Sequence, residues 1–279
     1  MPGSILSSAG EIPNGPIMRP IITLTSDFGA GSPYVAQMKG VILSLCRDIE
    51  LIDISHAVRP QAIREGAIVL ADATTRFPHG TIHVAVVDPG VGTSRRMVYA
   101  EIGGQRYVAP DNGLLSLLAL GHRPRSIISI ENREYWLSDA SNTFQGRDIM
   151  APVAAHLARD LEPQKLGPAR SSIEMLDWPQ PTKSAGGLAG TVIHVDSFGN
   201  LITNLMRTDV LAIGAPNSLI IDCGGLKIAG IVPTYGAALP HELIALFDSQ
   251  GRLEIAKVSA NAALELGLGV GERVSVVQP

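Results

Sequence analysis

The sequence is poor in aromatic and charged residues and has no long apolar run. Aromatic side chains account for 4% and charged side chains for 17% of the 279 residues, and the formal net charge is −4. Lysine and arginine are scattered along the chain, so the basic surface that binds nucleic acid is missing. No run of about 18 apolar residues occurs, so no segment is predicted to span a membrane. Neither a nucleic acid nor a membrane is therefore expected as a partner.

Cysteine is scarce as well. Only Cys46 and Cys223 occur, and neither belongs to a Cys-x-x-Cys motif, so two free thiols in a reducing, cytoplasmic environment are expected. The histidines show neither His-Glu-x-x-His nor His-x-His spacing, so no metal site is expected. Residues 1–18 lack the basic start and apolar core of a signal peptide and are predicted to be a mobile tail.

The next part of the chain alternates strands with helices. Three apolar runs predict buried strands, at residues 20–29, 49–55 and 81–88. One helix is predicted to begin with Ser32 as its N-cap and Pro33 in its first turn, and another to run through residues 61–77. This alternation predicts an α/β N-terminal domain with a largely parallel sheet, over residues 19–178.

The last third of the chain has a different pattern. Residues 176–187 are rich in Pro, Gly and Ser and are predicted to form a linker. Short strands separated by glycine turns follow over residues 188–279, and they predict a smaller all-β domain, either a barrel or a sandwich.

Acidic residues follow several of the predicted strands. Asp27 and Asp88 end two strands of the α/β domain, and Asp196 ends the first long strand of the all-β domain. Ligands of open α/β sheets bind at the carboxyl ends of the strands, so Asp27 and Asp88 are candidates to share a crevice. Asp196 joins them only if the second domain contributes to the same site. The alternative is that each aspartate only initiates a turn.

Two further segments carry polar groups beside glycine. In "TFQGRDIM", Asp148 falls in a first helical turn, where a carboxylate stabilises the helix, so Arg147 and Asp148 have a structural interpretation. In "DSFGNLITNL", Phe198 and Asn200 flank Gly199. A phenyl ring can stack on a planar heterocycle and an amide can hydrogen-bond to it, which indicates a ligand at this turn. Neither a P-loop, a complete GxGxxG nor a GxSxG elbow is present.

The ordered motifs "TSDFG", "DISH", "VVDPGVGT", "APDNGLL", "TFQGRDIM", "DSFGNLITN" and "PTYG" resemble those of the S-adenosylmethionine hydroxide adenosyltransferases. These enzymes are also called adenosine-forming S-adenosylmethionine hydrolases, and the fluorinating and chlorinating enzymes are their relatives. The resemblance covers residues 20–279. It implies a homotrimer in which the α/β domain of one subunit packs on the C-terminal β-barrel of another, with the substrate between them. It also implies cleavage of the C5′–sulfur bond into adenosine and methionine, with no cofactor.

The resemblance also implies roles for individual residues. Asp88 and Arg95 resemble the pair that activates the attacking water, and Gln145 stands third beside them. The remaining positions resemble substrate-binding residues of the family: Asp27 for the ribose hydroxyls, Asp196 for the methionine ammonium, Ser249 near the methionine carboxylate, and Phe198, Asn200 and Tyr235 around the adenine.

Two positions depart from the pattern. The hydrolases have a histidine where this chain has Gln145, and the fluorinating relatives have a carboxylate-binding arginine where it has Gln250. Three hypotheses follow. The first is hydrolysis of S-adenosylmethionine. The second is a halide-using adenosyltransferase, which Asp88 disfavours because a carboxylate repels a halide. The third is a non-catalytic protein that binds adenosine or S-adenosylmethionine, because glutamine cannot take a proton near neutral pH.

Overall fold

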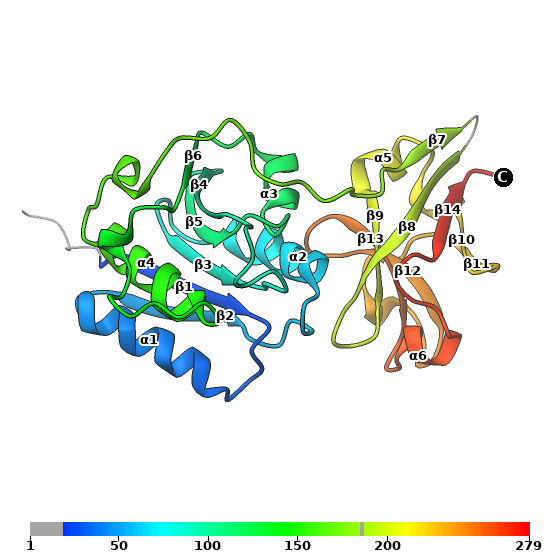
Figure 1. The fold of residues 1–279 in the computed structure, drawn as a ribbon. Coiled ribbons are helices and arrows are strands. Elements are labelled where there is room, and N and C mark those ends of the chain that lie inside the picture. Colours follow the sequence, from blue (N-terminus) through cyan, green and yellow to red (C-terminus); the bar gives the residue numbers. More distant parts are fainter. Residues whose placement is uncertain (1–18, 185–186) are drawn as a thin grey trace, which may run out of the picture. The chain divides into compact units, whose positions relative to one another are not determined.

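The computed structural model describes residues 19–184 and 187–279, so the predicted tail at residues 1–18 lies outside it. The described chain forms two compact units (Figure 1). The first contains the residues up to Pro60, Arg76–Pro110 and Pro124–Ser172, and the second contains Gln61–Thr75, Asp111–Arg123 and Ile173–Pro279. The predicted domain bounds, 19–178 and 188–279, stay a prediction. They divide the sequence into continuous stretches, whereas the two compact units are each made of several segments.

The first unit is built on a six-stranded sheet in the order β2-β1-β3-β5-β4-β6. Its strands are β1 (Ile21–Ser26), β2 (Glu50–Ser55), β3 (Ile82–Val86), β4 (Met97–Ile102), β5 (Gln105–Pro110) and β6 (Ser126–Ser129). The pairs from β2 to β5 are parallel, whereas β4 runs antiparallel to both β5 and β6. The predicted α/β class with a largely parallel sheet is confirmed.

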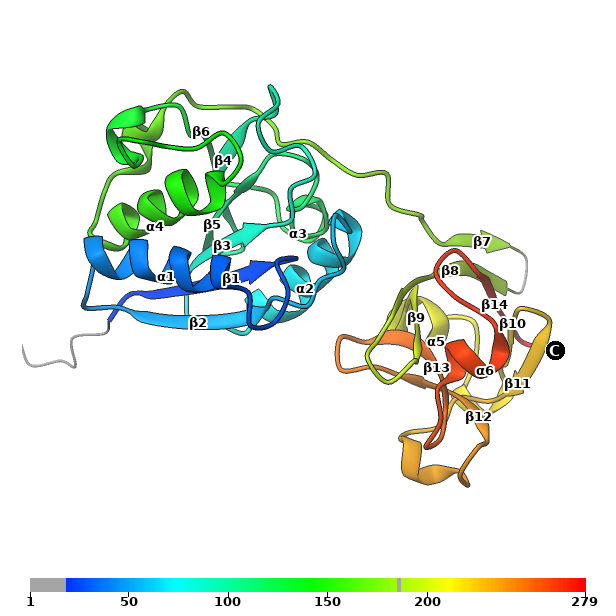
Figure 2. The same ribbon diagram turned by 60° about the horizontal axis from the view of Figure 1, so that its bottom comes forward.

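Helices α1 (Pro33–Leu45) and α4 (Ala151–Ala158) lie side by side in both ribbon views (Figures 1 and 2). The Ser32 side chain caps α1 by accepting a hydrogen bond from the Tyr34 amide, as predicted. Met38 and Ile42 of α1 are buried in one core with Val153 and Leu157 of α4. This apolar contact fixes α4, and with it the segment that leads into α4.

The segment before α4 is one turn of π-helix, η2 (Gly146–Met150). Gly146 allows this turn to approach the sheet closely. A Cβ atom there would lie 3.3 Å from Cγ2 of Val86 and 3.5 Å from the sulfur of Met38. Because Gly146 has no side chain, the π-turn lies close to β3. Gln145, the preceding residue, therefore lies near the end of that strand. Single π-turns are frequent at functional sites.

The second unit is an antiparallel sheet in the order β11-β10-β14-β8-β9-β13-β12, and its end strands β11 and β12 contact each other. The sheet is therefore nearly closed, which confirms a barrel-like domain and decides against a sandwich. Its strands are β7 (Thr182–Ser184), β8 (Gly187–Val195), β9 (Leu201–Met206), β10 (Ile220–Cys223), β11 (Leu226–Ala229), β12 (Leu243–Phe247), β13 (Arg252–Lys257) and β14 (Arg273–Val277). Helices α2 (Ile63–Thr74), α3 (Ser116–Gly121), α5 (Arg207–Leu211) and α6 (Ala262–Leu266) belong to the same unit.

The segment predicted to be a linker, residues 176–187, is held by contacts at two places. Trp178 is buried against α2, and its Nε1 donates a hydrogen bond to Ser116 Oγ at 2.8 Å. Residues 182–184 form strand β7, which pairs with β8. Proline and glycine suggested an open connection, but one large aromatic side chain anchors the segment.

Two predictions from composition can be checked on the described residues. Cys46 and Cys223 are both free, as expected. In the part of the chain that the structure describes, no helix is long and apolar enough to cross a membrane.

His83 on β3 provides a test of how the first unit responds to pH. Its side chain is fully buried, bonded through Nδ1 to Thr23 Oγ1 at 2.7 Å and stacked on Tyr107. Burial lowers the pKa of His83 to about 4. The neutral form is therefore favoured by folding, and this stability is present above pH 6.5 and lost as the pH falls toward 4.

We expect the unfolding free energy of the wild type to fall between pH 6.5 and 4 by roughly 2–3 kcal/mol more than that of His83→Asn, which cannot titrate. Urea unfolding at a series of pH values measures the difference. Parallel pH dependences of the two proteins would contradict it.

Candidate active site

Asp88 and Arg95 form a buried ion pair at the end of β3. Nε of Arg95 lies 2.9 and 3.0 Å from the two carboxylate oxygens of Asp88, and Nη2 donates to Oδ2 as well. The side chains are 5% exposed for Asp88 and 11% exposed for Arg95. A guanidinium that contacts both oxygens fixes the plane of the carboxylate.

The turn after Asp88 brings Arg95 back onto the carboxylate. The Val91 amide donates to the Asp88 carbonyl, and both the amide and the hydroxyl of Thr93 donate to the Gly90 carbonyl. A Cβ atom on Gly90 would lie 3.2 Å from Cγ of Arg95. The glycine therefore leaves the room that the arginine stem needs, which explains the Pro-Gly turn between the two charged residues.

Gln145 completes a group of three side chains. It lies at the start of the π-turn, and its Oε1 accepts a hydrogen bond from Nη2 of Arg95. One guanidinium thus contacts Asp88 and Gln145 together, across 50 residues of sequence. The structure brings together the three residues that the sequence predicted to be catalytic, and Gln145 uses its acceptor atom in this contact.

Asp27 follows β1, the strand next to β3. Ser26 pairs with Val86 in parallel register, and the Asp27 amide lies 3.4 Å from the Val86 carbonyl oxygen. Asp27 and Asp88 are therefore at the carboxyl ends of neighbouring parallel strands, where a ligand site of such a sheet is expected.

An aromatic cluster of Phe28, Tyr34 and Phe144 joins the loop after β1 to the segment before the π-turn. The ring centroids lie 5.2–5.8 Å apart, all in edge-to-face geometry. Phe28 follows Asp27, and Phe144 precedes Gln145, so the cluster fixes the backbone beside both residues. This cluster was not predicted, because three aromatic residues in separate segments leave no local pattern in the sequence.

Arg147 and Asp148 have the structural role that the sequence allowed. The Asp148 carboxylate is buried and accepts hydrogen bonds from Arg147 at 2.5 and 2.9 Å and from the Ser141 amide at 2.9 Å. Arg147 also donates to Gln37 of α1 at 2.7 Å and lies over the Phe144 ring. These contacts hold the π-turn to α1.

The second unit contains the other predicted residues. Asp196 follows β8, and its Oδ1 accepts hydrogen bonds from the Phe198 and Asn200 amides at 2.9 and 2.8 Å. Its Oδ2 accepts from the Asn200 side chain at 3.0 Å. Asp196 therefore shapes the β8–β9 turn, as the alternative interpretation of a turn-initiating aspartate expected, and this turn presents Phe198 and Asn200.

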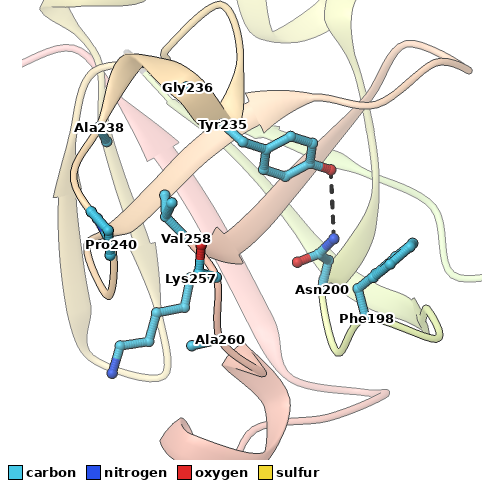
Figure 3. Close-up of a pocket in the computed structure, with 10 residues that line it drawn as sticks. Phe198, Asn200, Tyr235, Gly236, Ala238, Pro240, Lys257, Val258 and Ala260 are labelled. Carbon is cyan, nitrogen blue, oxygen red and sulfur yellow. Dashed lines mark hydrogen bonds between the residues drawn. The ribbon is translucent and has the colours of Figure 1, made fainter.

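Phe198, Asn200 and Tyr235 line a cavity of about 740 Å³ in the second unit (Figure 3). The Phe198 side chain stands out from the turn and is 76% exposed. The Asn200 amide points at the Tyr235 hydroxyl, 3.5 Å away (Figure 3). An exposed aromatic ring beside a buried amide suits a planar heteroaromatic ligand.

A second cavity, of about 480 Å³, shares Phe198 and Tyr235 with the first and is also lined by Asp196 and Ser249. Its buried Glu254 was not predicted. The Tyr235 hydroxyl donates to Glu254 Oε1 at 2.5 Å, and burial raises the pKa of this carboxyl group. A glutamate in the apolar strand "RLEIAK" is the signal that could have revealed it.

Ser249 is exposed in a turn that Asp248 closes. The Asp248 carboxylate accepts hydrogen bonds from the amides of Gln250 and Arg252, both at 2.8 Å. Arg252 donates in turn to Asp72 of α2 at 2.5 Å. Among residues 19–184 and 187–279, no group of three or more His, Cys, Asp and Glu side chains is placed to hold a metal ion.

Known proteins resemble this chain over nearly its whole length. A (R)-S-adenosyl-L-methionine hydrolase of Salinispora tropica is 39% identical over 92% of this chain and 97% of its own. The hydrolase of the same name from Thermus thermophilus is 38% identical over 93% of this chain and 100% of its own. A fluorinase of an Actinoplanes species is 31% identical, covering 93% of this chain and 98% of its own.

A solved structure is similar to this chain over nearly its whole length as well. A crystal structure of an uncharacterized conserved protein from Thermotoga maritima superposes with a TM-score of 0.87 at 35% identity, covering 92% of this chain and 99% of that one. The model of the SAM hydroxide adenosyltransferase N-terminal domain matches residues 22–167, and that of the C-terminal domain matches residues 190–275. This chain belongs to the SAM hydroxide adenosyltransferase family.

Proposed function

We propose that this protein hydrolyses S-adenosyl-L-methionine to adenosine and L-methionine by attack of an activated water on C5′. The observation that carries the proposal is the buried Asp88 carboxylate held by Arg95 with Gln145 beside it. The names of the relatives, hydrolases at 38–39% identity, point to the same reaction.

The chemistry of the substrate suits this group of side chains. S-adenosylmethionine is a sulfonium cation, so its leaving group is a neutral thioether and needs no general acid. The difficult part is to hold a water in line with C5′ and to accept its proton, which an ionised carboxylate can do. Arg95 orients the Asp88 carboxylate, and Gln145 can hold the water by a hydrogen bond. Charge is dispersed as an oxygen nucleophile attacks a cation, so a site of low polarity favours the transition state.

The proposal assigns substrate contacts to residues of both units. Asp27 is the ligand of the ribose hydroxyls, since a carboxylate can accept from both members of a cis-diol. Phe198, Asn200 and Tyr235 surround the adenine. Asp196 and Ser249 are assigned to the methionine ammonium and carboxylate.

The proposal includes a cytoplasmic homotrimer whose active sites are shared between subunits, with no cofactor. The family resemblance is its basis, and the distribution of the assigned residues over two compact units is compatible with it. The α/β unit of one subunit would then complete a site with the barrel unit of another.

Two other functions remain to be separated by experiment. Transfer of the adenosyl group to a halide is disfavoured by Asp88, because an ionised carboxylate repels the anion at the position of attack. Non-catalytic binding of adenosine or S-adenosylmethionine is favoured by Gln145, which offers no titrating nitrogen.

Incubation of the purified protein with S-adenosylmethionine, with and without chloride, distinguishes the three functions. We expect adenosine and methionine in both conditions and a loss of turnover of roughly 10²–10⁴-fold in Asp88→Asn, which keeps the size of the side chain but not its basicity. Chromatography of the nucleoside products is the measurement. A 5′-chloro nucleoside would support the transferase, and unchanged substrate the binding protein. Turnover by Asp88→Asn within about threefold of the wild type would rule out Asp88 as the base.

Shared active sites can be tested by mixing inactive chains. Asp27→Ala and Asp196→Ala each remove one proposed substrate contact from a different unit. If a site draws on two chains, trimers assembled from both variants contain some sites without either substitution, and activity returns. The activity of mixed, tag-selected trimers measures this. No recovery in such trimers would place the whole site within one chain.

Replacing the third residue tests the role of Gln145. We expect Gln145→His to raise the rate by about tenfold, which is less than a well-placed acid–base group provides, since its surroundings are not built for an imidazole. A histidine nitrogen can accept the hydrogen bond from Arg95 and can also carry a proton, with an unperturbed pKa of about 6.5. Single-turnover rates across a pH series decide the matter. Identical rates and pH profiles would mean that this position only holds water.

A further inference from the structure

We propose that His56 is a positioning residue that holds the Asp27 loop in the conformation needed to bind a nucleoside. The inference rests on the proposed role of Asp27 as ligand of the ribose hydroxyls. His56 follows β2, whereas Asp27 follows β1, so the two lie at the same edge of the sheet.

An irregularity in the β1–β2 pairing gives His56 its place. Leu24 pairs with Asp53, but the next residue of β1, Thr25, pairs with Ser55, so Ile54 is an extra residue in β2. Such a bulge shifts the following residues by one position and redirects their side chains. It brings His56 opposite Ser26, the last residue before Asp27.

His56 binds the chain on both sides of Asp27. Its Nδ1 lies 2.7 Å from Ser26 Oγ, and its carbonyl oxygen accepts a hydrogen bond from the Gly29 amide at 2.8 Å. The Phe28 amide donates to the same Ser26 hydroxyl at 3.3 Å. The residues around Asp27 are thereby tied to one histidine, and the direction of the carboxylate depends on it.

His56 is itself held in place. Its Nε2 lies 3.1 Å from Oδ1 of Asp53, and Oδ2 of Asp53 accepts a hydrogen bond from Lys39 of α1 at 2.6 Å. Only 11% of the His56 side chain is exposed. The ring is therefore held by its Nδ1 hydrogen bond and by burial, with the Asp53 carboxylate close to its other nitrogen, as a positioning group requires.

Ser26, His56 and Asp53 share residue types with a catalytic triad, but burial argues for a different role. Ser26 is 2% exposed, so its hydroxyl is not accessible to a substrate. A nucleophilic serine must reach the reacting carbon. The group acts instead through the backbone that it holds.

The effect is specific to the sugar. Asp27 can accept from the 2′- and 3′-hydroxyls together only if its carboxylate faces them, and a hydrogen bond to a charged group is worth enough to change affinity by about tenfold. A shifted loop should therefore weaken adenosine, which has both hydroxyls, far more than 2′-deoxyadenosine.

Calorimetric binding of adenosine and 2′-deoxyadenosine to the full chain tests the inference without turnover. We expect His56→Leu and Ser26→Ala to weaken adenosine binding about tenfold and 2′-deoxyadenosine binding less than threefold. His56→Asn keeps a polar atom near the place of Nδ1 and should restore adenosine binding to within about threefold of the wild type. Thr23→Val is the matched control, because Thr23 is a buried β1 hydroxyl that also bonds a histidine Nδ1 at 2.7 Å, and it should leave both affinities unchanged.

Equal losses for both nucleosides, or no loss in a folded Ser26→Ala protein, would overturn the inference, as would a wild type without preference for adenosine. Should His56→Leu fail to fold, Ser26→Ala and His56→Asn still decide the question. A protein that shows the expected preference but leaves S-adenosylmethionine intact supports the role of His56 and contradicts the proposed reaction, so the two failures are distinguishable.

Discussion

The contact on which the candidate site depends is the Arg95 guanidinium between Asp88 and Gln145. It satisfies a carboxylate that is nearly removed from solvent, and it joins the end of β3 to the π-turn before α4. An unpaired carboxylate at this depth would cost several kcal/mol or take up a proton. The turn of Pro89 and Gly90, the close approach of Gly146 to the sheet, and the packing of α1 on α4 all serve to bring this contact about.

The two units present different chemical groups. The first presents the carboxylates of Asp27 and Asp88 at the ends of neighbouring strands. An aromatic cluster fixes the backbone next to Asp27 and Gln145. The second presents an exposed phenyl ring and an amide on a hairpin turn, above cavities with a buried carboxylate. Strand-end carboxylates of neighbouring parallel strands therefore belong to the first unit, whereas the exposed phenyl ring and the amide belong to a turn of the second.

Much of this could be predicted from the sequence, where the signals are local. The strands and the capped start of α1 follow from periodicity and N-cap chemistry, whereas the pairing of Asp88 with Arg95 was implied by the family resemblance. Contacts between distant segments could not be predicted. The ring cluster of Phe28, Tyr34 and Phe144 leaves no trace in any one window, and neither does the burial of Trp178 in a segment whose composition resembles a linker. The bulge at Ile54 that aims His56 depends on strand register, which only the paired strands reveal.

The path of the chain has a consequence for how the protein can be divided. Because the residues 61–75 and 111–123 group with the barrel unit, the backbone passes from one unit to the other five times. Trp178 strengthens this arrangement by packing on a helix from much earlier in the sequence. A single cut near residue 180 would therefore separate the barrel strands from two helices that group with them. Neither unit exists as one continuous stretch of sequence, so the isolated halves are poor candidates for independent folding.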